Sequence, residues 1–239
     1  MRPLPDLDLA RIAPLPNDQK WHALRQMKLA YPPYSYLPTR RVLPDLLNVD
    51  AGPLGMVPRA PWAQIAEEIV RRSRTEVEKL ANLAVGEALY AFASDHSIMG
   101  RRHEFFPLTV GLSEKVTYWV QAVISLGGRP TVPFIDPRRS KKLTSEGRRF
   151  AFSVMHERIR MPDPDFAGVE LAIIQFDVLD EAGRLVRRPK LHIAADLKLY
   201  DFDTIDSMVR ETYEVWQAVL AEREAETRRR GTGTTGPLL

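Results

Sequence analysis

The chain has no cysteine among its 239 residues, which excludes disulfide bonds and cysteine-based zinc sites. Proteins without disulfides are typical of a reducing compartment, so we expect a cytoplasmic location. No uninterrupted apolar run reaches the roughly 18 residues that a membrane helix requires. The first residues, MRPLPDLDLARIAPLP, also lack the apolar core of a signal peptide. We therefore expect no membrane partner.

Several short catalytic motifs are missing as well. The sequence contains no glycine-rich phosphate loop, no GxSxG nucleophile elbow and no HExxH zinc motif, and it shows no internal repeat. Functional groups must therefore be sought in less specific patterns.

Positive charge is only slightly in excess, with a net charge of +3 at pH 7, but the basic residues occur in clusters. Clusters that converge on one face would supply the salt-dependent phosphate affinity of a nucleic-acid-binding protein. Arginine pairs also decorate turns and helix surfaces for solubility, so both interpretations stay open. The richest cluster lies in the polar stretch 136–149, where Asp136 and Glu146 form a rival acidic pair. Its candidate nucleic-acid contacts are Arg138, Arg139, Lys141, Lys142, Arg148 and Arg149.

Hydrophobic patterning predicts an α+β fold. Apolar residues recur at three- and four-residue steps in 61–93, with Val77 and Leu80 in the stripe, and again in 203–226. Alternation with a period of two predicts strands at 115–126, where a helix also fits, and at 150–160. We expect a central, mostly antiparallel sheet flanked by a long helix from the first half of the chain and a C-terminal helix.

Proline is concentrated near the start of the chain. Residues 1–60 show little periodicity apart from one short capped helix at 17–30, so we expect a proline-rich arm there. Its segment 31–58 should be ordered by contact with something else, and a protein partner is one candidate. A single α+β domain then spans 61–226, and 227–239 is expected to be a disordered tail.

Two strand-like runs, 169–179 and 191–200, are joined by a turn around Gly183. If they pair antiparallel about this turn, position 180 lies near position 185 and the register continues outward. Pro189 cannot donate to a ladder, so a bulge there would shift the register. The strands therefore predict a hairpin whose open ends approach each other.

Acidic residues and one lysine gather at the open end of this hairpin. The register places Asp165 opposite Tyr200, with Asp196 and Lys198 within a few residues along the partner strand. Two carboxylates can hold Mg²⁺, which prefers oxygen ligands, and the metal activates a bound water. The lysine can position that water or contact the scissile phosphate.

These residues resemble the PD-(D/E)xK nuclease superfamily, with Pro164-Asp165 as the first half-motif and Asp196-Leu197-Lys198 as the second. The resemblance implies a Mg²⁺-dependent phosphodiesterase in which Asp165 and Asp196 bind the metal and Lys198 is the catalytic lysine. Such families commonly add an acid from a preceding helix, for which Glu87 is the best candidate. Two departures are that Asp163 is an equal candidate and that the second motif has Asp where Glu is commoner.

Two functions from different classes stay open. The leading hypothesis is a magnesium-dependent nuclease that acts at the hairpin. The alternative is a non-catalytic nucleic-acid-binding or assembly subunit of a larger nucleoprotein complex, in which the basic residues hold phosphates and the acids are structural. A D-x-K strand and a Pro-Asp turn also occur widely without any function.

Overall fold

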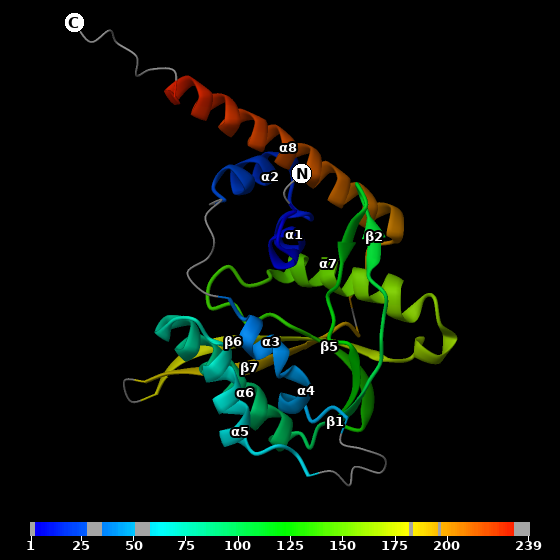
Figure 1. Cartoon of the computed structure of the whole chain (residues 1–239). Helices are drawn as coiled ribbons and strands as arrows, with labels where there is room; N and C mark the ends of the chain where they lie inside the picture. Colours follow the sequence, from blue (N-terminus) through cyan, green and yellow to red (C-terminus); the bar gives the residue numbers. More distant parts are fainter. Residues whose placement is uncertain (1–2, 28–34, 51–57, 182–183, 196, 232–239) are drawn as a thin grey trace, which may run out of the picture.

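The fold is taken from a computed structural model that describes residues 3–27, 35–50, 58–181, 184–195 and 197–231, with only the backbone at 181, 184, 185, 230 and 231. Its helices are α1 (Asp6–Ile12), α2 (Asn17–Arg25), α3 (Leu37–Arg41), α4 (Leu43–Leu46), α5 (Trp62–Arg72), α6 (Glu76–Asp95), α7 (Ser145–Met155) and α8 (Phe202–Gly231). A π-helical turn (His156–Arg160) and a 3-10 turn (Pro164–Phe166) follow α7. Its strands are β1 (Met99–Arg102), β2 (Leu108–Val110), β3 (Glu114–Val116), β4 (Ala122–Leu126), β5 (Arg129–Ile135), β6 (Glu170–Glu181) and β7 (Arg184–Ile193) (Figure 1).

A five-stranded sheet in the order β1-β4-β5-β6-β7 forms the centre of the fold. Three of its strand pairs are antiparallel, and β5–β6 is parallel. Parallel neighbours need a long crossover, and here α7 supplies it between β5 and β6. The expected α+β fold with a mostly antiparallel sheet is therefore confirmed.

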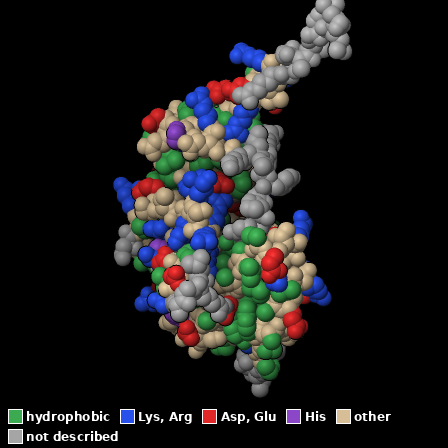
Figure 2. All heavy atoms as spheres, turned by 90° about the vertical axis from the view of Figure 1, so that its left-hand side faces the viewer, with side chains coloured by type: hydrophobic (Ala, Val, Ile, Leu, Met, Phe, Trp, Pro, Cys, Tyr) green, Lys and Arg blue, Asp and Glu red, His purple; other side chains and the backbone are tan. Residues whose placement is uncertain are grey.

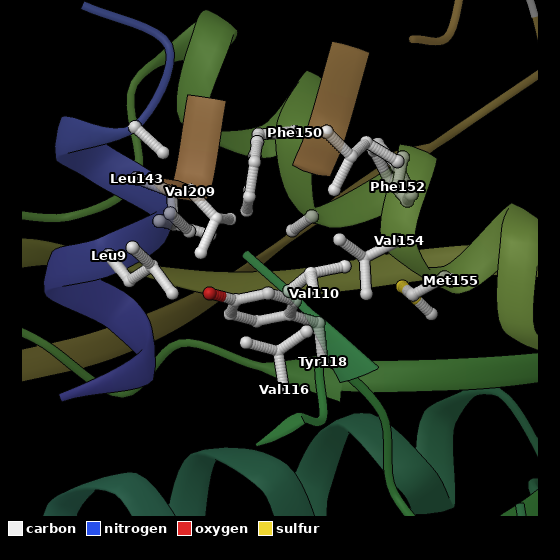
Figure 3. Packing of buried hydrophobic residues seen from close by; sticks show 14 of the residues in the cluster. Leu9, Val110, Val116, Tyr118, Leu143, Phe150, Phe152, Val154, Met155 and Val209 are labelled. Atoms are coloured by element: carbon white, nitrogen blue, oxygen red, sulfur yellow. The ribbon is translucent and has the colours of Figure 1, made fainter. Parts of the chain in front are cut away.

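Helices cover both faces of this sheet (Figure 1). Successive residues of β6 point to opposite faces, so Leu171 and Ile173 pack with α1, α7 and α8, whereas Ile174 and Phe176 pack with α4, α5 and α6. In Figure 3, Leu9 of α1 and Val209 of α8 point toward the ring of Tyr118 in the first of these two cores. Fully burying one such apolar side chain contributes about 1.5–3 kcal/mol.

The predicted helix at 61–93 is two helices, α5 and α6. Ser73 leaves the helical backbone with an extended ψ of 136°, which ends α5. The side chain of Thr75 then accepts a hydrogen bond from the N–H of Glu78 and caps α6. The two helices pack against each other, with Trp62 at the start of α5 beside Tyr90 near the end of α6. The apolar residues predicted to line one helix are therefore divided between two antiparallel helices.

The predicted strand at 150–160 is wrong, because this stretch forms α7 and the π-helical turn. Every residue from Phe150 to Met155 is buried, including Ser153, so no exposed polar position marks a helical period. The prediction at 115–126 holds at its two ends only, where β3 and β4 lie on either side of 117–121.

The chain termini also differ from expectation. Within the described part of 1–60 there are four helices rather than one, and α1 and α2 pack against α7 and α8. The helix α8 continues to Gly231, so the tail predicted to begin at 227 is helical over its first residues. Residues 232–239 lie outside the described part of the chain, and the division of the chain at residue 60 stays a prediction.

The hairpin of β6 and β7 has the predicted register. Asp180 pairs with Leu185, and the same register continues without interruption to Ala172 and Ile193. Pro189 lies opposite Phe176 inside this ladder and causes no slip. Among the described residues, no helix has the length and apolar character needed to cross a bilayer.

Candidate functional site

The hairpin does not extend far enough to assemble the acidic site predicted at its open end. The ladder stops at Ala172, and Asp165 lies before it in the exposed 3-10 turn, where its N–H donates to Asp163 Oδ1 at 3.0 Å. Lys198 is exposed beyond β7, and its carbonyl accepts from Arg149. Asp196 lies outside the described residues.

Glu87, the proposed additional acid, is on the other side of the sheet. It lies exposed on α6, in the layer that packs on Ile174, whereas Phe166 beside Asp165 packs with the α7 layer. Within the described ranges, no three His, Asp or Glu side chains are grouped to hold a metal ion. The described residues therefore do not bring together the ligands expected for magnesium.

The basic stretch at 136–149 is a loop up to residue 144 and then the start of α7, and it is folded back onto the protein. Arg138 makes two hydrogen bonds to the Asp8 carboxylate, at 2.9 and 3.0 Å. Arg149 stacks on the ring of Tyr200 and pairs with Glu146 at 3.6 Å. These two guanidinium groups therefore hold α1 and the C-terminal segment in place, which is a structural role that composition does not reveal.

The remaining four basic residues of the loop divide into two kinds. Lys142 donates to Phe176 O at 2.7 Å and to Asp177 at 3.0 Å, and Arg148 donates to Gln175 Oε1 at 3.1 Å. Both thus reach across to β6 while staying partly exposed. Arg139 and Lys141 are exposed at the tip of the loop.

Asp136 organises this loop from inside. It is fully buried at the end of β5, and its Oδ2 accepts from the N–H of Leu143 at 2.9 Å and from Gln175 Nε2 at 2.8 Å. Its Oδ1 accepts from the N–H of Arg138 at 3.3 Å. A buried carboxylate is tolerated when hydrogen bonds satisfy it, so Asp136 is a structural anchor rather than half of a rival acidic site.

His192 on β7 lies beside these cations. Its Nε2 is buried and makes no hydrogen bond within the described structure. Burial, and next the positive charges of Arg148 and Lys190, lower the pKa of His192 from 6.5 to about 4. The folded protein therefore favours the neutral ring.

This shift predicts a loss of stability in acid. Between pH 6.5 and 4 the unfolded chain binds more protons at His192 than the folded chain does, so stability falls as the pH falls. We expect the contribution to be about 1 kcal/mol after discounting for partial exposure to solvent. Urea unfolding at pH 7 and pH 4.5 would measure it, with His192→Gln as the comparison. An equal fall in both proteins would contradict the assignment.

The clearest exposed apolar surface lies over α3, α5 and α6. Figure 2 shows a strip of hydrophobic side chains on the lower part of that face, where Figure 1 places α5 and α6. Val77 and Leu80 of α6 are each 58% exposed, and Leu37 of α3 and Val70 of α5 are also exposed. We call these four residues the α6 apolar face. Contiguous apolar surface of this kind is typical of protein-binding sites.

A groove of about 610 Å³ lies between α6 and β7, and its lining on α6 begins at Ala84, one helical turn after Leu80. Its lining is largely apolar, with the carboxylates of Glu87 and Asp95 on α6 at one rim and the buried Arg187 of β7 among the lining residues. The apolar lining residues are Ala84, Ala88, Ala91, Phe92, Val186 and Pro189. An apolar face that leads into a groove fits a protein segment better than a small charged substrate.

Hydrogen bonds fix α3 beside the α6 apolar face. The Asn82 side chain accepts from the N–H and hydroxyl of Thr39, at 3.0 and 2.7 Å. Its amide group donates to Ser35 O and Glu78 O, both at 2.8 Å. Ser35 and Thr39, in the described part of the predicted 31–58 arm, are therefore held against α6.

Comparison with known proteins identifies the family. The model of the family "Sliding clamp-binding bacterial toxin SocB" matches residues 7–226. The chain is 37% identical over 230 residues to "DNA replication inhibitor toxin SocB" of Caulobacter vibrioides (strain NA1000 / CB15N), covering 96% of this chain and 95% of that protein. No solved structure matches.

These matches overturn the nuclease hypothesis and, with it, the hydrolase and magnesium assignments, because they relate almost the whole chain to a replication inhibitor that binds a protein. The resemblance to PD-(D/E)xK nucleases, carried by Pro164-Asp165 and Asp196-Leu197-Lys198, covers far less of the chain. Of the two hypotheses from the sequence, the non-catalytic binding or assembly subunit agrees better with these matches than the nuclease does. The chain belongs to the SocB family of sliding clamp-binding bacterial toxins.

Proposed function

We propose that this chain binds a bacterial sliding clamp and thereby inhibits DNA replication. The observation that carries the proposal is the similarity to the Caulobacter toxin, which extends over 96% of this chain. Inhibition by binding needs no chemical step, because a clamp surface occupied by one protein is closed to others. Such a protein would act in the cytoplasm, where the replication machinery operates.

We further propose that the α6 apolar face and the 31–58 arm make the clamp contact. Leu37, Val77 and Leu80 expose large apolar side chains next to a groove, and α3 holds the arm beside them. Burying a large apolar side chain contributes about 1.5–3 kcal/mol, and a few such residues dominate most interfaces. The carboxylates of Glu87 and Asp95 at the α6 rim of the groove would then set the orientation of the partner.

A charge placed in the middle of this face should weaken clamp binding. We expect Val77→Asp combined with Leu80→Asp to lower the affinity for the purified clamp of the host by at least about 30-fold, since two apolar contacts are lost and two carboxylates are desolvated. Surface plasmon resonance measures the affinity. Unchanged folding is checked by circular dichroism, because both positions are exposed.

The matched control is Met161→Asp, which replaces another exposed apolar side chain, next to the π-helical turn, with a carboxylate. Its clamp affinity should equal that of the wild-type protein. If the double variant binds as tightly as the control, the contact lies elsewhere. If the wild-type protein does not bind the clamp and does not slow clamp-dependent DNA synthesis, the proposed function itself fails.

A further inference from the structure

The loop at 136–149 and the strand β7 place their cations on one surface. Lys142 and Arg148 reach from the loop and α7 to Asp177 and Gln175 on β6. The register pairs Asp177 with Arg188 and Gln175 with Lys190 on β7. Side chains of directly opposed residues stand on the same face of a sheet. Arg188 and Lys190 therefore stand on the face of β6 and β7 that Lys142 and Arg148 contact.

This surface has a strong excess of positive charge. Lys142, Arg148, Arg188 and Lys190 surround the single carboxylate of Asp177, and Arg139 and Lys141 extend from the adjacent loop tip. Figure 2 shows Lys and Arg side chains gathered in the middle of the face, between the layers of α6 and α8. We call these six residues the basic surface. Arg138 and Arg149 do not belong to it, because their side chains reach Asp8, Glu146 and Tyr200 rather than the strands β6 and β7.

We propose that the basic surface contacts the phosphate backbone of duplex DNA while the chain is bound to the clamp. Its place in the clamp complex rests on the proposed function, but the affinity for DNA does not. The sequence pattern pointed to the loop alone, and the structure adds Arg188 and Lys190 of β7 and removes Arg138 and Arg149.

The chemistry of the surface favours a polyanion over an acidic protein. Protein interfaces have an apolar centre that is depleted of lysine, whereas the exposed members of this surface are lysines and arginines. Arg188 and Lys190 are two residues apart on one strand, so their Cα atoms are about 6.6 Å apart. A DNA strand carries one charge per about 3.4 Å of axis, so both side chains can reach neighbouring phosphates. No base edge needs to be read, so we expect binding without sequence preference.

The neutral state of His192 is consistent with this assignment. The imidazole lies among Arg148, Lys190 and Lys142, with Asp177 as the one acid that faces it. A bound phosphate would offset these charges and permit the ring to protonate. As the pH falls below 6.5, DNA affinity should therefore rise, whereas lysine and arginine, which stay charged throughout this range, would leave it unchanged.

The test uses Arg188→Glu combined with Lys190→Glu and a fluorescent 30-base-pair duplex without clamp. At 50 mM salt we expect at least a tenfold loss of affinity in fluorescence anisotropy, and a salt dependence of log K that is shallower by about 1.8, since about 0.9 is lost per phosphate contact. The matched control is Arg101→Glu with Lys115→Glu. These two exposed cations lie on β1, at the opposite edge of the five-stranded sheet from β7, and on β3, in the separate two-stranded sheet. Arg139→Glu, at an exposed loop position, is a second test if the β7 variant unfolds.

The outcomes separate the two proposals. Loss of DNA affinity in the β7 variant with clamp affinity unchanged supports the basic surface. Equal DNA affinity in the β7 variant and the control overturns it, and so does wild-type binding to polyglutamate as tight as binding to DNA. Loss of clamp binding in the absence of DNA would show instead that these cations belong to the protein interface, which also overturns the DNA assignment.

Discussion

Replacing Asp136 with alanine is expected to lower the free energy of unfolding by about 3–5 kcal/mol, because three donors lose a charged acceptor in the interior. The N–H of Leu143 and the side-chain amide of Gln175 donate to Oδ2, and the N–H of Arg138 donates to Oδ1. Asp136 is fully buried, so water cannot replace the lost oxygen atoms without opening the loop. An unpaired buried donor costs about 1–3 kcal/mol.

Urea unfolding at pH 7 would measure this loss, with Asp177→Ala as the matched control. Asp177 is an acid of the same neighbourhood that pairs with Lys142, but its side chain is 49% exposed. An exposed ion pair contributes at most about 1 kcal/mol, so the control should remain close to the wild-type protein. If Asp136→Ala costs no more than the control, the loop does not depend on its buried anchor.

The register of the hairpin could be predicted from sequence because two independent signals agree there. Apolar and polar residues alternate in β6, and a glycine turn sets which residues face each other. Pro189 argued against the register only if β7 were an internal strand. The structure places β7 at the edge of the sheet, where a missing N–H need cost no ladder hydrogen bond.

The helix α7 could not be recognised from periodicity. Its residues Phe150 to Met155 are buried on all sides between α1, α8 and the sheet, so polar residues do not mark an outer face. Short apolar runs of this kind fit a strand and a buried helix equally well. The parallel pairing of β5 with β6 was the missing constraint, since it requires a crossover.

The exposure of Val77 and Leu80 could not be predicted for a related reason. Periodicity assigned Val77 and Leu80 to the buried stripe of a helix, but an apolar stripe faces either the core or a partner with the same spacing. Whether the stripe of α6 faces the core or the surface depends on where α3 and α5 pack against it, and the sequence of α6 alone does not contain this. The predicted pairing of Asp165 with Tyr200 does not form, because the ladder ends at Ala172, seven residues after Asp165. Asp136 had a usable signal, since it directly follows the strand β5.

Replacing Asn82 with alanine is expected to lower the free energy of unfolding by about 3 kcal/mol, because one fully buried amide joins α3 to α6. Its oxygen accepts from Thr39, and its amide donates to Ser35 O and Glu78 O. Loss of these bonds leaves the buried N–H of Thr39 without its acceptor. The control Gln64→Ala removes an exposed amide from the neighbouring helix α5 and should change stability by less than about 0.5 kcal/mol.

A double-mutant cycle with Thr39→Val would assign this loss to the joint between α3 and α6. The Thr39 hydroxyl lies 2.7 Å from the Asn82 side-chain oxygen, so we expect a coupling free energy of about 1–2 kcal/mol in urea unfolding. If α3 carries the arm to the clamp, Asn82→Ala should also weaken clamp binding at temperatures where the protein stays folded. If a folded Asn82→Ala protein binds the clamp as tightly as the wild-type protein, Val77 and Leu80 form the contact without α3. If the stability losses of Asn82→Ala and Thr39→Val simply add in the double variant, packing rather than this amide holds α3 against α6.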